Sequence, residues 1–256
     1  MASVADPEIV VLRDAGLVAQ FTATRLIAAL VDAQVARGSA SMVLTGGGIG
    51  LAALQAVREH PARDAVDWSA VDVFWGDERF VGADDAERND RGAGEALLDH
   101  IPLDERRVHR MLGSDEVGSP EESAARYAEV LAEFAGRDGL RDRLPSFDIV
   151  LLGMGPEGHV ASIFPNAPAV KAEAMAVAVR DCPKAPPTRV SLTFPVIRNA
   201  AEVWLIVTTA DKAAAVARAV AGADPNDVPA AGARGRNRTL FVLDRAAAGD
   251  LSSAGR

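Results

Sequence analysis

Short apolar runs alternate with longer helical segments along nearly the whole chain of 256 residues. A strand, a helix of about 10–15 residues and a second strand form a crossover unit, which joins two parallel strands of one sheet. Such strands are buried on both faces, so their sequences are continuous apolar runs such as VWLIVT at 203–208. The alternation therefore predicts an α/β fold: an open, mostly parallel sheet with helices on both faces.

The strongest helix signal begins at Ser119. This residue is an N-cap, Pro120 follows at the first helical position, and Glu122 completes a capping box. The predicted helices cover residues 14–38, 51–60, 119–134 and about 211–221. The predicted strands cover residues 8–12, 41–45, 71–75, 147–152, 175–179, 189–194, 203–208 and 239–243. Residues 223–238, which contain Gly, Pro and Asn, are predicted to form a long surface loop.

The domain organisation is predicted to be simple. No internal repeat, low-complexity linker or shift in composition divides the sequence. We therefore expect a single α/β domain over residues 1–256, with its core at about 8–245 and a frayed C-terminal tail.

The composition excludes several classes of protein. With 27 Lys and Arg against 36 Asp and Glu, the net charge is −9, so no nucleic acid partner is predicted. The single cysteine, Cys182, excludes a disulfide scaffold or a Cys-rich zinc module and favours a reducing compartment. No basic segment followed by a long apolar stretch begins the chain, and no apolar run approaches the roughly 20 residues of a membrane span. We expect a cytoplasmic protein with no membrane partner, as a monomer or a small homo-oligomer.

Four segments at predicted strand ends carry glycine-rich or charged sequence. They are TGGGIG at 45–50, GDERF at 76–80, GMGPEGH at 153–159 and TTADK at 208–212. In open α/β sheets, ligands bind beyond the carboxyl ends of the strands. We therefore expect the four segments to meet at one site.

The glycine cluster permits two interpretations. Gly46, Gly47 and Gly48 can direct backbone N–H groups at a phosphate, or they can form a tight turn without a ligand. The Walker pattern is absent. Residues 48–53 satisfy GxGxxA, but the nearest strand-end acid, Asp77, lies 27 residues past the last glycine rather than about 20, so a dinucleotide site fits less well.

Charged side chains follow the predicted strand at 71–75. Asp77 and Arg79 can form a solvated ion pair of little energetic value, or they can point into the crevice, where Arg79 would bind a carbonyl oxygen or a carboxylate. The acidic residues at 84–90 lack the spacing of an EF-hand loop, so no metal site is predicted.

His159 is the only one of the four histidines in a glycine-framed loop at a strand end. It is either a structural histidine or a general base that activates water, with Glu157 orienting it. Arg189 and Lys212 are candidates for pairing with phosphate. A single basic residue is usually solvated, but all of these groups fall at the same predicted edge of the sheet.

Together, the motifs resemble the 6-phosphogluconolactonase family, whose fold is shared with glucosamine-6-phosphate deaminases. The segments occur in the family's order over about residues 8–250: TGGGIG, WGDERFV followed by Asn89, LGMGPEGHVASIFP, RVSLTFPVIRNA and VTTADK. The resemblance implies a Rossmann-like fold without a metal or cofactor. It also implies hydrolysis of 6-phospho-D-glucono-1,5-lactone to 6-phosphogluconate, a step of the oxidative pentose phosphate pathway.

The resemblance also implies roles for individual residues. His159 corresponds to the family's water-activating base, and Asp77 and Arg79 to its charged strand-end pair. The positions that it places along the substrate and phosphate site are Gly46, Gly47, Gly48, Asn89, Glu157, Arg189 and Lys212. The chain departs from the usual family pattern at Glu157, where Asp is common, and at Thr209, where Gly is common.

Three other functions stay open on the residues alone. A deaminase or isomerase of the same fold would have a proton-transferring Glu at the position of Phe164, whose apolar ring favours the lactonase. A regulator that binds a sugar phosphate without catalysis would need a protein partner, because no DNA-binding segment is visible. A nicotinamide-dependent oxidoreductase would be revealed by cofactor titration.

Overall fold

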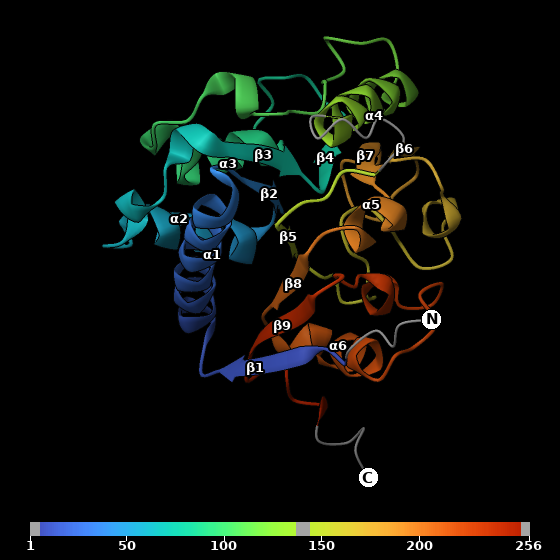
Figure 1. The fold of residues 1–256 in the computed structure, drawn as a ribbon. Coiled ribbons are helices and arrows are strands. Elements are labelled where there is room, and N and C mark those ends of the chain that lie inside the picture. Colours follow the sequence, from blue (N-terminus) through green and yellow to red (C-terminus); the bar gives the residue numbers. More distant parts are fainter. Residues whose placement is uncertain (1–5, 137–143, 252–256) are drawn as a thin grey trace.

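The computed structural model describes residues 6–136 and 144–251, and within them a six-stranded sheet forms the centre of the molecule (Figure 1). The strands are β1 (Glu8–Leu12), β2 (Ala40–Leu44), β3 (Val71–Trp75), β5 (Ile149–Leu152), β8 (Glu202–Val207) and β9 (Arg238–Asp244). All neighbouring pairs are parallel, in the order β1-β9-β8-β5-β2-β3. The predicted α/β fold with a mostly parallel sheet is confirmed.

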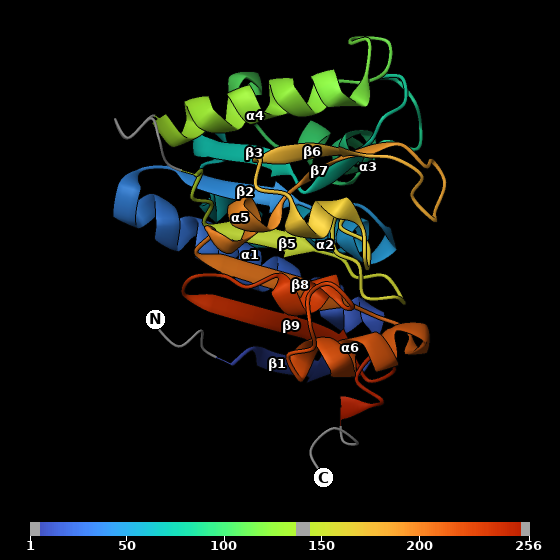
Figure 2. The same cartoon turned by 90° about the vertical axis from the view of Figure 1, so that its right-hand side faces the viewer.

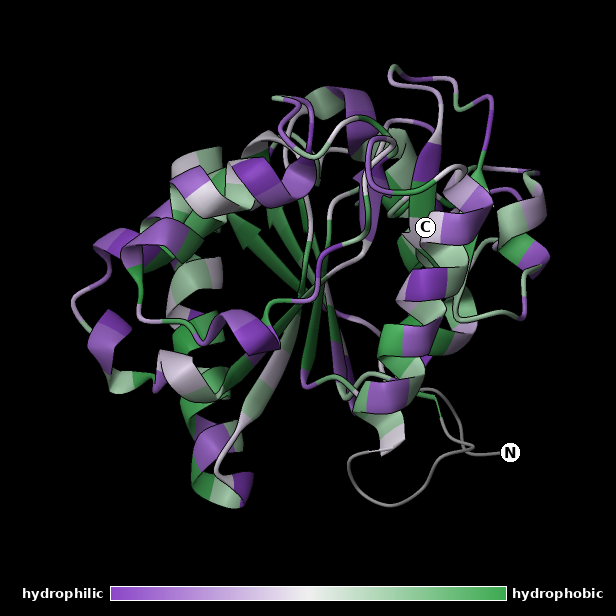
Figure 3. Cartoon of the chain, turned by 90° about the horizontal axis from the view of Figure 1, so that it is seen from above, coloured by the Kyte–Doolittle hydropathy of each residue, from purple (hydrophilic) through white to green (hydrophobic). Residues whose placement is uncertain are grey.

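Side chains along each strand alternate between two layers of apolar core. In β8, Val203 and Leu205 belong to one layer, and Trp204 and Ile206 belong to the other. The first layer packs against α4 (Pro120–Gly136), α5 (Phe194–Arg198) and α6 (Ala213–Val220), and the second against α1 (Ala15–Arg37), α2 (Gly48–Glu59) and α3 (Asn89–Ala96). Figure 3 shows the apolar strands between these two helical layers. Burial on both faces explains the continuous apolar runs.

Capping side chains fix the ends of the longest helices. Asp14 Oδ1 accepts from the N–H of Leu17 at 3.0 Å, and α1 ends at Gly38, whose φ is 76°. Ser119 Oγ accepts from the N–H of Glu122 at 3.1 Å at the start of α4. The predicted boundaries of α1 and the predicted start of α4 are confirmed, while α4 extends two residues beyond its predicted end at 134.

The expectation that no segment is long and apolar enough to span a membrane is wrong for α1. Among the described residues, this one helix of 23 residues passes a test of length and composition for a membrane span. A core helix of a globular protein passes the same test, and α1 buries Val18, Leu26 and Leu30 in the core against the sheet and α2.

A second, smaller sheet lies beside the first, beneath α4 (Figure 2). It consists of β4 (Asp77–Arg79), β7 (Arg189–Leu192) and β6 (Ala176–Val179), paired antiparallel in the order β4-β7-β6. The strands predicted at 175–179 and 189–194 therefore exist, but they lie outside the parallel sheet. Since β4 directly follows β3, this small sheet carries the charged segment to the carboxyl edge of the large one.

The segment 223–238, predicted as a surface loop, has exposed residues near both ends, but its middle at 228–233 is buried. Val228 and Ala230 are completely buried, and the N–H of Ala230 donates to the carbonyl of Gly158 at 2.9 Å. The C-terminal tail after residue 245 is predicted to be frayed. Residues 245–251 form turns in which Ala247 is buried, and residues 252–256 lie outside the described residues.

Candidate active site

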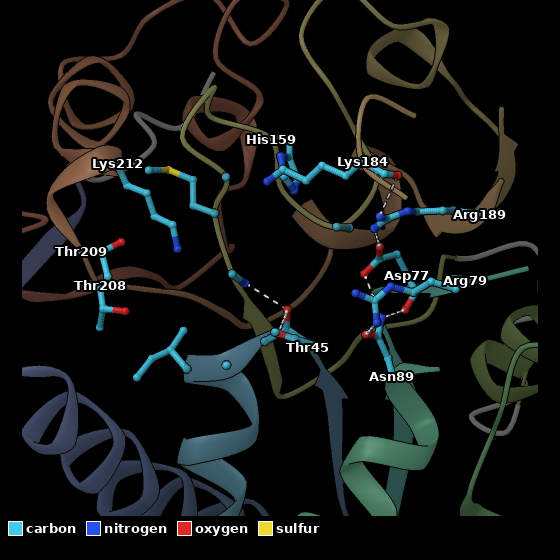
Figure 4. A pocket seen from close by; sticks show the side chains of 18 of the residues that line it. Thr45, Asp77, Arg79, Asn89, His159, Lys184, Arg189, Thr208, Thr209 and Lys212 are labelled. Carbon is cyan, nitrogen blue, oxygen red and sulfur yellow. Dashed lines mark hydrogen bonds and ion pairs between the residues drawn. The ribbon is translucent and has the colours of Figure 1, made fainter. Parts of the chain in front are cut away.

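A pocket of about 450 Å³ opens where β2, β5 and β8 reach their carboxyl ends (Figure 4). Its lining comes from all four strand-end segments that the sequence singles out and from the loop before β7. The polar side chains that line it belong to Thr45, Asp77, Arg79, Asn89, His159, Lys184, Arg189, Thr208, Thr209 and Lys212. The expectation that the strand-end segments meet at one place is therefore confirmed.

The glycine turn after β2 brings backbone to the pocket floor. Gly47 has a φ of 81°, and α2 begins at Gly48, three residues before the predicted start at Leu51. The first N–H groups of a helix have no acceptor within it, and the helix dipole adds positive potential there. A Cβ on Gly46 would lie 1.8 Å from Asn89 Oδ1, so a glycine is required for Asn89 to reach the pocket.

Asn89 joins the charged pair of β4. Its Nδ2 donates to the backbone carbonyl of Asp77 at 2.8 Å, and its Oδ1 accepts from Arg79 Nη1. The same Nη1 donates to the carbonyl of Glu87 at 2.7 Å. Arg79 Nε is buried and has no hydrogen-bond partner among the described residues, while the residue as a whole lines the pocket with its positive charge.

Asp77 is a buried carboxylate with three partners. Its Oδ2 accepts from Ser162 Oγ at 2.6 Å and lies 3.7 Å from Arg189 Nη1, and its Oδ1 accepts from Asn89 Nδ2 at 3.5 Å. These contacts compensate the burial of its charge and fix its side chain. Asp77 is the only acidic residue among those of the described chain that line the pocket.

His159 and Glu157 form a hydrogen-bonded pair. His159 Nδ1 lies 2.8 Å from Glu157 Oε1. This bond, above all other influences, lowers the pKa of Glu157 to about 2, so Glu157 is ionised at neutral pH and can only accept. The proton of a neutral imidazole therefore resides on Nδ1, and Nε2 is left with a free lone pair. Glu157 lies behind the histidine and does not line the pocket.

The loop that carries His159 is shaped by close packing. A Cβ on Gly155 would lie 2.1 Å from His159 Nδ1, so the imidazole packs directly on a glycine backbone. Gly158, with a φ of 91°, packs closely against the buried side chain of Val228. A Cβ on Gly158 would lie 2.7 Å from Val228 Cγ1. The ring of Phe164 covers the imidazole at a centroid distance of 4.4 Å.

Arg189 organises the loop before its own strand. Its Nε donates to the carbonyl of Pro186 at 3.1 Å, and its Nη2 donates to the carbonyls of Lys184 and Ala185, each at 3.3 Å. These bonds place Lys184 at the pocket, where its Nζ lies 3.9 Å from Glu157 Oε2.

Lys212 lies across the pocket from Arg189 and Asp77 (Figure 4). It precedes α6 and follows Thr209, whose φ of 82° is unusual for a β-branched residue. Burial lowers the pKa of Lys212, with the neighbouring cation Lys184 adding to the effect. Arg79, Lys184, Arg189 and Lys212 thus give this pocket a local positive charge within a chain of net charge −9.

Of the predicted site residues, only Glu157 does not line the pocket, and it contacts one that does. The sequence analysis missed Lys184, whereas Thr45 and Thr208 lie in segments that it singled out without assigning them a role. Of the three lysines in the chain, two, Lys184 and Lys212, line this pocket.

The fold and the pocket together define a class: an α/β protein with a cationic, histidine-containing ligand site at the carboxyl edge of a parallel sheet. Residues 13–242 match the family model of glucosamine-6-phosphate isomerases and 6-phosphogluconolactonases, and the chain belongs to this family.

Several relatives of the chain bear the name 6-phosphogluconolactonase. The chain is 53% identical to the 6-phosphogluconolactonase of Streptomyces coelicolor, over 96% of this chain and 95% of the relative. It is 48% identical to that of Mycobacterium tuberculosis, over 94% of this chain and 96% of the relative. Among solved structures, the 6-phosphogluconolactonase of Trypanosoma cruzi superposes with a TM-score of 0.84 at 26% identity, covering 98% of this chain and 99% of the other.

Proposed function

We propose that this chain hydrolyses 6-phospho-D-glucono-1,5-lactone to 6-phosphogluconate, with His159 as the base that activates water. The observation that carries the mechanism is the His159–Glu157 pair at the edge of a cationic pocket. The pair fixes the tautomer whose Nε2 accepts a proton, and the cationic walls suit a phosphorylated substrate. Relatives with this activity by name cover nearly the whole chain.

The reaction consists of two proton transfers around one tetrahedral intermediate. His159 Nε2 takes a proton from water while the water oxygen bonds to the lactone carbonyl carbon. The carbonyl becomes an oxyanion, which Arg79 or backbone N–H groups at the glycine turn stabilise. The bond from the carbonyl carbon to the ring oxygen then breaks, and the imidazolium returns its proton to that oxygen. The product is an open-chain carboxylic acid, and His159 is neutral again.

Binding of the phosphate group orients the lactone in the pocket. We assign it to the N–H groups at Gly46, Gly47 and Gly48 together with Lys212, in a pocket to which Arg189 contributes. Binding energy from this remote group places the carbonyl against the activated water. Asn89 and Asp77 complete the wall on the side of Arg79.

The alternative within the family is deamination of an aminosugar phosphate. Phe164 stands where the resemblance implies a proton-transferring Glu in the deaminases, and its ring is buried against His159. An apolar ring cannot open a sugar by proton transfer. The geometry therefore favours the lactonase.

A coupled assay tests the activity. Glucose-6-phosphate dehydrogenase generates the lactone in place, and acid release is compared with the spontaneous rate. Glucosamine 6-phosphate is tested in parallel for ammonia release. Acceleration of acid release without ammonia is expected, whereas ammonia production would transfer the chain to the other branch of the family.

His159→Ala should lower kcat roughly 10²- to 10⁴-fold, because the water then lacks its general base. Glu157→Gln keeps the size of the carboxylate but not its charge, and should give a smaller loss. Circular dichroism spectra of both variants control for folding. Full activity in a folded His159→Ala protein would show that another group activates the water.

The wider setting follows from the same proposal. We infer that the chain acts in the oxidative pentose phosphate pathway, where this lactone is formed. A cytoplasmic location agrees with its single cysteine and acidic charge.

A further inference from the structure

Glu78 lies between two pocket residues of the sequence but does not line the pocket itself. Its side chain is only 2% exposed. Oε1 accepts from the N–H of Arg79 at 2.8 Å and from the N–H of Asn89 at 2.7 Å. Oε2 accepts from the N–H of Asp90 at 2.8 Å. One buried carboxylate thus binds three backbone donors on two elements, β4 and α3.

The contact supplies α3 with an N-terminal cap from another element. Arg88, the N-cap residue of α3, makes no capping hydrogen bond with its own side chain. The carboxylate of Glu78 satisfies the first N–H groups instead, and its charge complements the helix dipole. The sequence of α3, NDRGAGEA, contains two glycines and has little helix propensity of its own.

The position of Asn89 depends on this cap. It is the first residue of α3, so fixing its N–H fixes the point from which its side chain extends to Arg79 Nη1 and to the carbonyl of Asp77. The Glu78 carboxylate also holds the N–H of Arg79. Arg79 and Asn89 are therefore bound to one another and to the same carboxylate of Glu78.

Burying the carboxylate of Glu78 costs free energy, because its charged form loses water. Burial raises the pKa of Glu78 to about 7, and the negative charge of Asp90 adds to this effect, while Arg88, at 3.9 Å, opposes it. The titratable side chain of Tyr127, from α4, also interacts with this carboxylate. A buried carboxylate is a poor choice for stability alone. Its presence beside the pocket favours a role in building the site.

We propose that Glu78 is a positioning residue for the lactonase reaction: its carboxylate ties β4 to the start of α3 and thereby holds Arg79 and Asn89 in place for the substrate. This inference rests on the function proposed above for the same pocket.

Kinetics at pH 8 test the proposal with Glu78→Gln, Asn89→Ala and the double mutant. Glu116→Gln is the matched control, because Glu116 Oε2 also accepts a backbone N–H, that of Gly113 at 2.7 Å, and it does not line this pocket. Glu78→Gln should lower kcat/KM roughly 10- to 100-fold, and Glu116→Gln less than about twofold. The double mutant should lose less than the product of the two single losses, because Glu78 acts in part through Asn89.

Two kinetic outcomes would overturn the proposal. One is a folded Glu78→Gln protein whose kcat/KM lies within about twofold of the wild type. The other is that the effects of Glu78→Gln and Asn89→Ala multiply, since independent effects would leave no coupling between the residues. If Glu78→Gln does not fold, Glu78→Asp is judged by the same criteria, because it keeps the charge but shortens its reach to α3.

Hydrogen exchange gives a readout that does not require lactonase activity. The amides of Arg79, Asn89 and Asp90 should exchange faster in Glu78→Gln than in the wild type, while those of β2 should not change. A wild type without lactonase activity would refute the proposed function, and exchange would still decide the anchoring. Unchanged exchange at these three amides would refute the anchoring itself.

Discussion

Thr209 has the largest positive φ among the described residues other than glycine. Its φ of 82° and ψ of 145° lie close to a region that is nearly restricted to glycine. The buried carboxylate of Asp244 holds it there by accepting its N–H at 3.1 and 3.2 Å. Thr209→Gly should raise the free energy of unfolding by about 1 kcal/mol, since strain of this kind costs on the order of 1–3 kcal/mol and glycine returns part of it as chain entropy. Urea unfolding measures the change.

Thr208→Gly is the matched control for that experiment. Thr208 is the preceding residue and is not among the described residues with positive φ, so glycine relieves no strain there. It should lower the free energy of unfolding by roughly 0.5–1 kcal/mol. Equal destabilisation by both substitutions would mean that the backbone at Thr209 is not strained.

The raised pKa of Glu78 predicts a pH dependence of stability. The folded protein binds this proton with a pKa of about 7, against an ordinary value of 4.5. Between these values the folded state carries more protons than the unfolded state, so the free energy of unfolding falls as pH rises from about 4.5 to about 7. Urea unfolding at a series of pH values should show this fall in the wild type. The free energy of unfolding of the wild type minus that of Glu78→Gln isolates the contribution of Glu78 and should fall over this pH range. A rise of this difference with pH would contradict the assignment.

At the residue scale, the sequence predicted best those polar site residues that directly follow a strand. His159, Arg79 and Lys212 follow apolar runs, and a parallel sheet brings such positions together. Lys184 precedes its strand, so the same argument could not find it. Its position depends on bonds from Arg189 to backbone carbonyls, which no local pattern encodes.

Among the elements, α4 packs on the sheets through apolar side chains and is also linked to β3 by a hydroxyl group. Tyr127 Oη accepts from the N–H of Trp75 at 3.0 Å and lies 3.2 Å from its carbonyl, at the end of edge strand β3. Tyr127→Phe leaves these buried groups without a partner and should lower the free energy of unfolding by about 1–3 kcal/mol. Urea unfolding with an unchanged m-value checks this. A variant as stable as the wild type would show that water replaces the hydroxyl.

The elements that the sequence missed owe their structure to contacts between distant segments. β4 consists of Asp77, Glu78 and Arg79, and it is a strand because β7 pairs with it. α3 has no apolar stripe and is capped from β4. Residues 228–233 of segment 223–238 are buried although its small residues show no periodicity, and they pack against the loop of His159. Apolar periodicity in a sequence indicates a helix or strand with one regularly buried face. None of these three segments has such a face, so the sequence pattern could not predict them.

For the whole molecule, the pocket connects segments that are far apart in the chain. Its walls come from residues 45–49, 77–89, 153–161, 184–189 and 208–212, on both core layers of the sheet. No part of this site can persist in the unfolded chain. Binding at the pocket should therefore stabilise the complete fold rather than one segment, and this agrees with our proposal of a single domain.

The product 6-phosphogluconate makes that expectation measurable, since the lactone itself hydrolyses spontaneously. At 100 times its Kd, a ligand that binds only the folded state adds about 2.7 kcal/mol to the free energy of unfolding. The thermal transition should move upward as one cooperative step, while sodium sulfate at equal ionic strength should move it less. Lys212→Ala should shift the dose response to higher product concentration, because a cation at the pocket is lost. Two transitions, of which only one responds to product, would show that the chain unfolds in separate units and that the pocket belongs to just one of them.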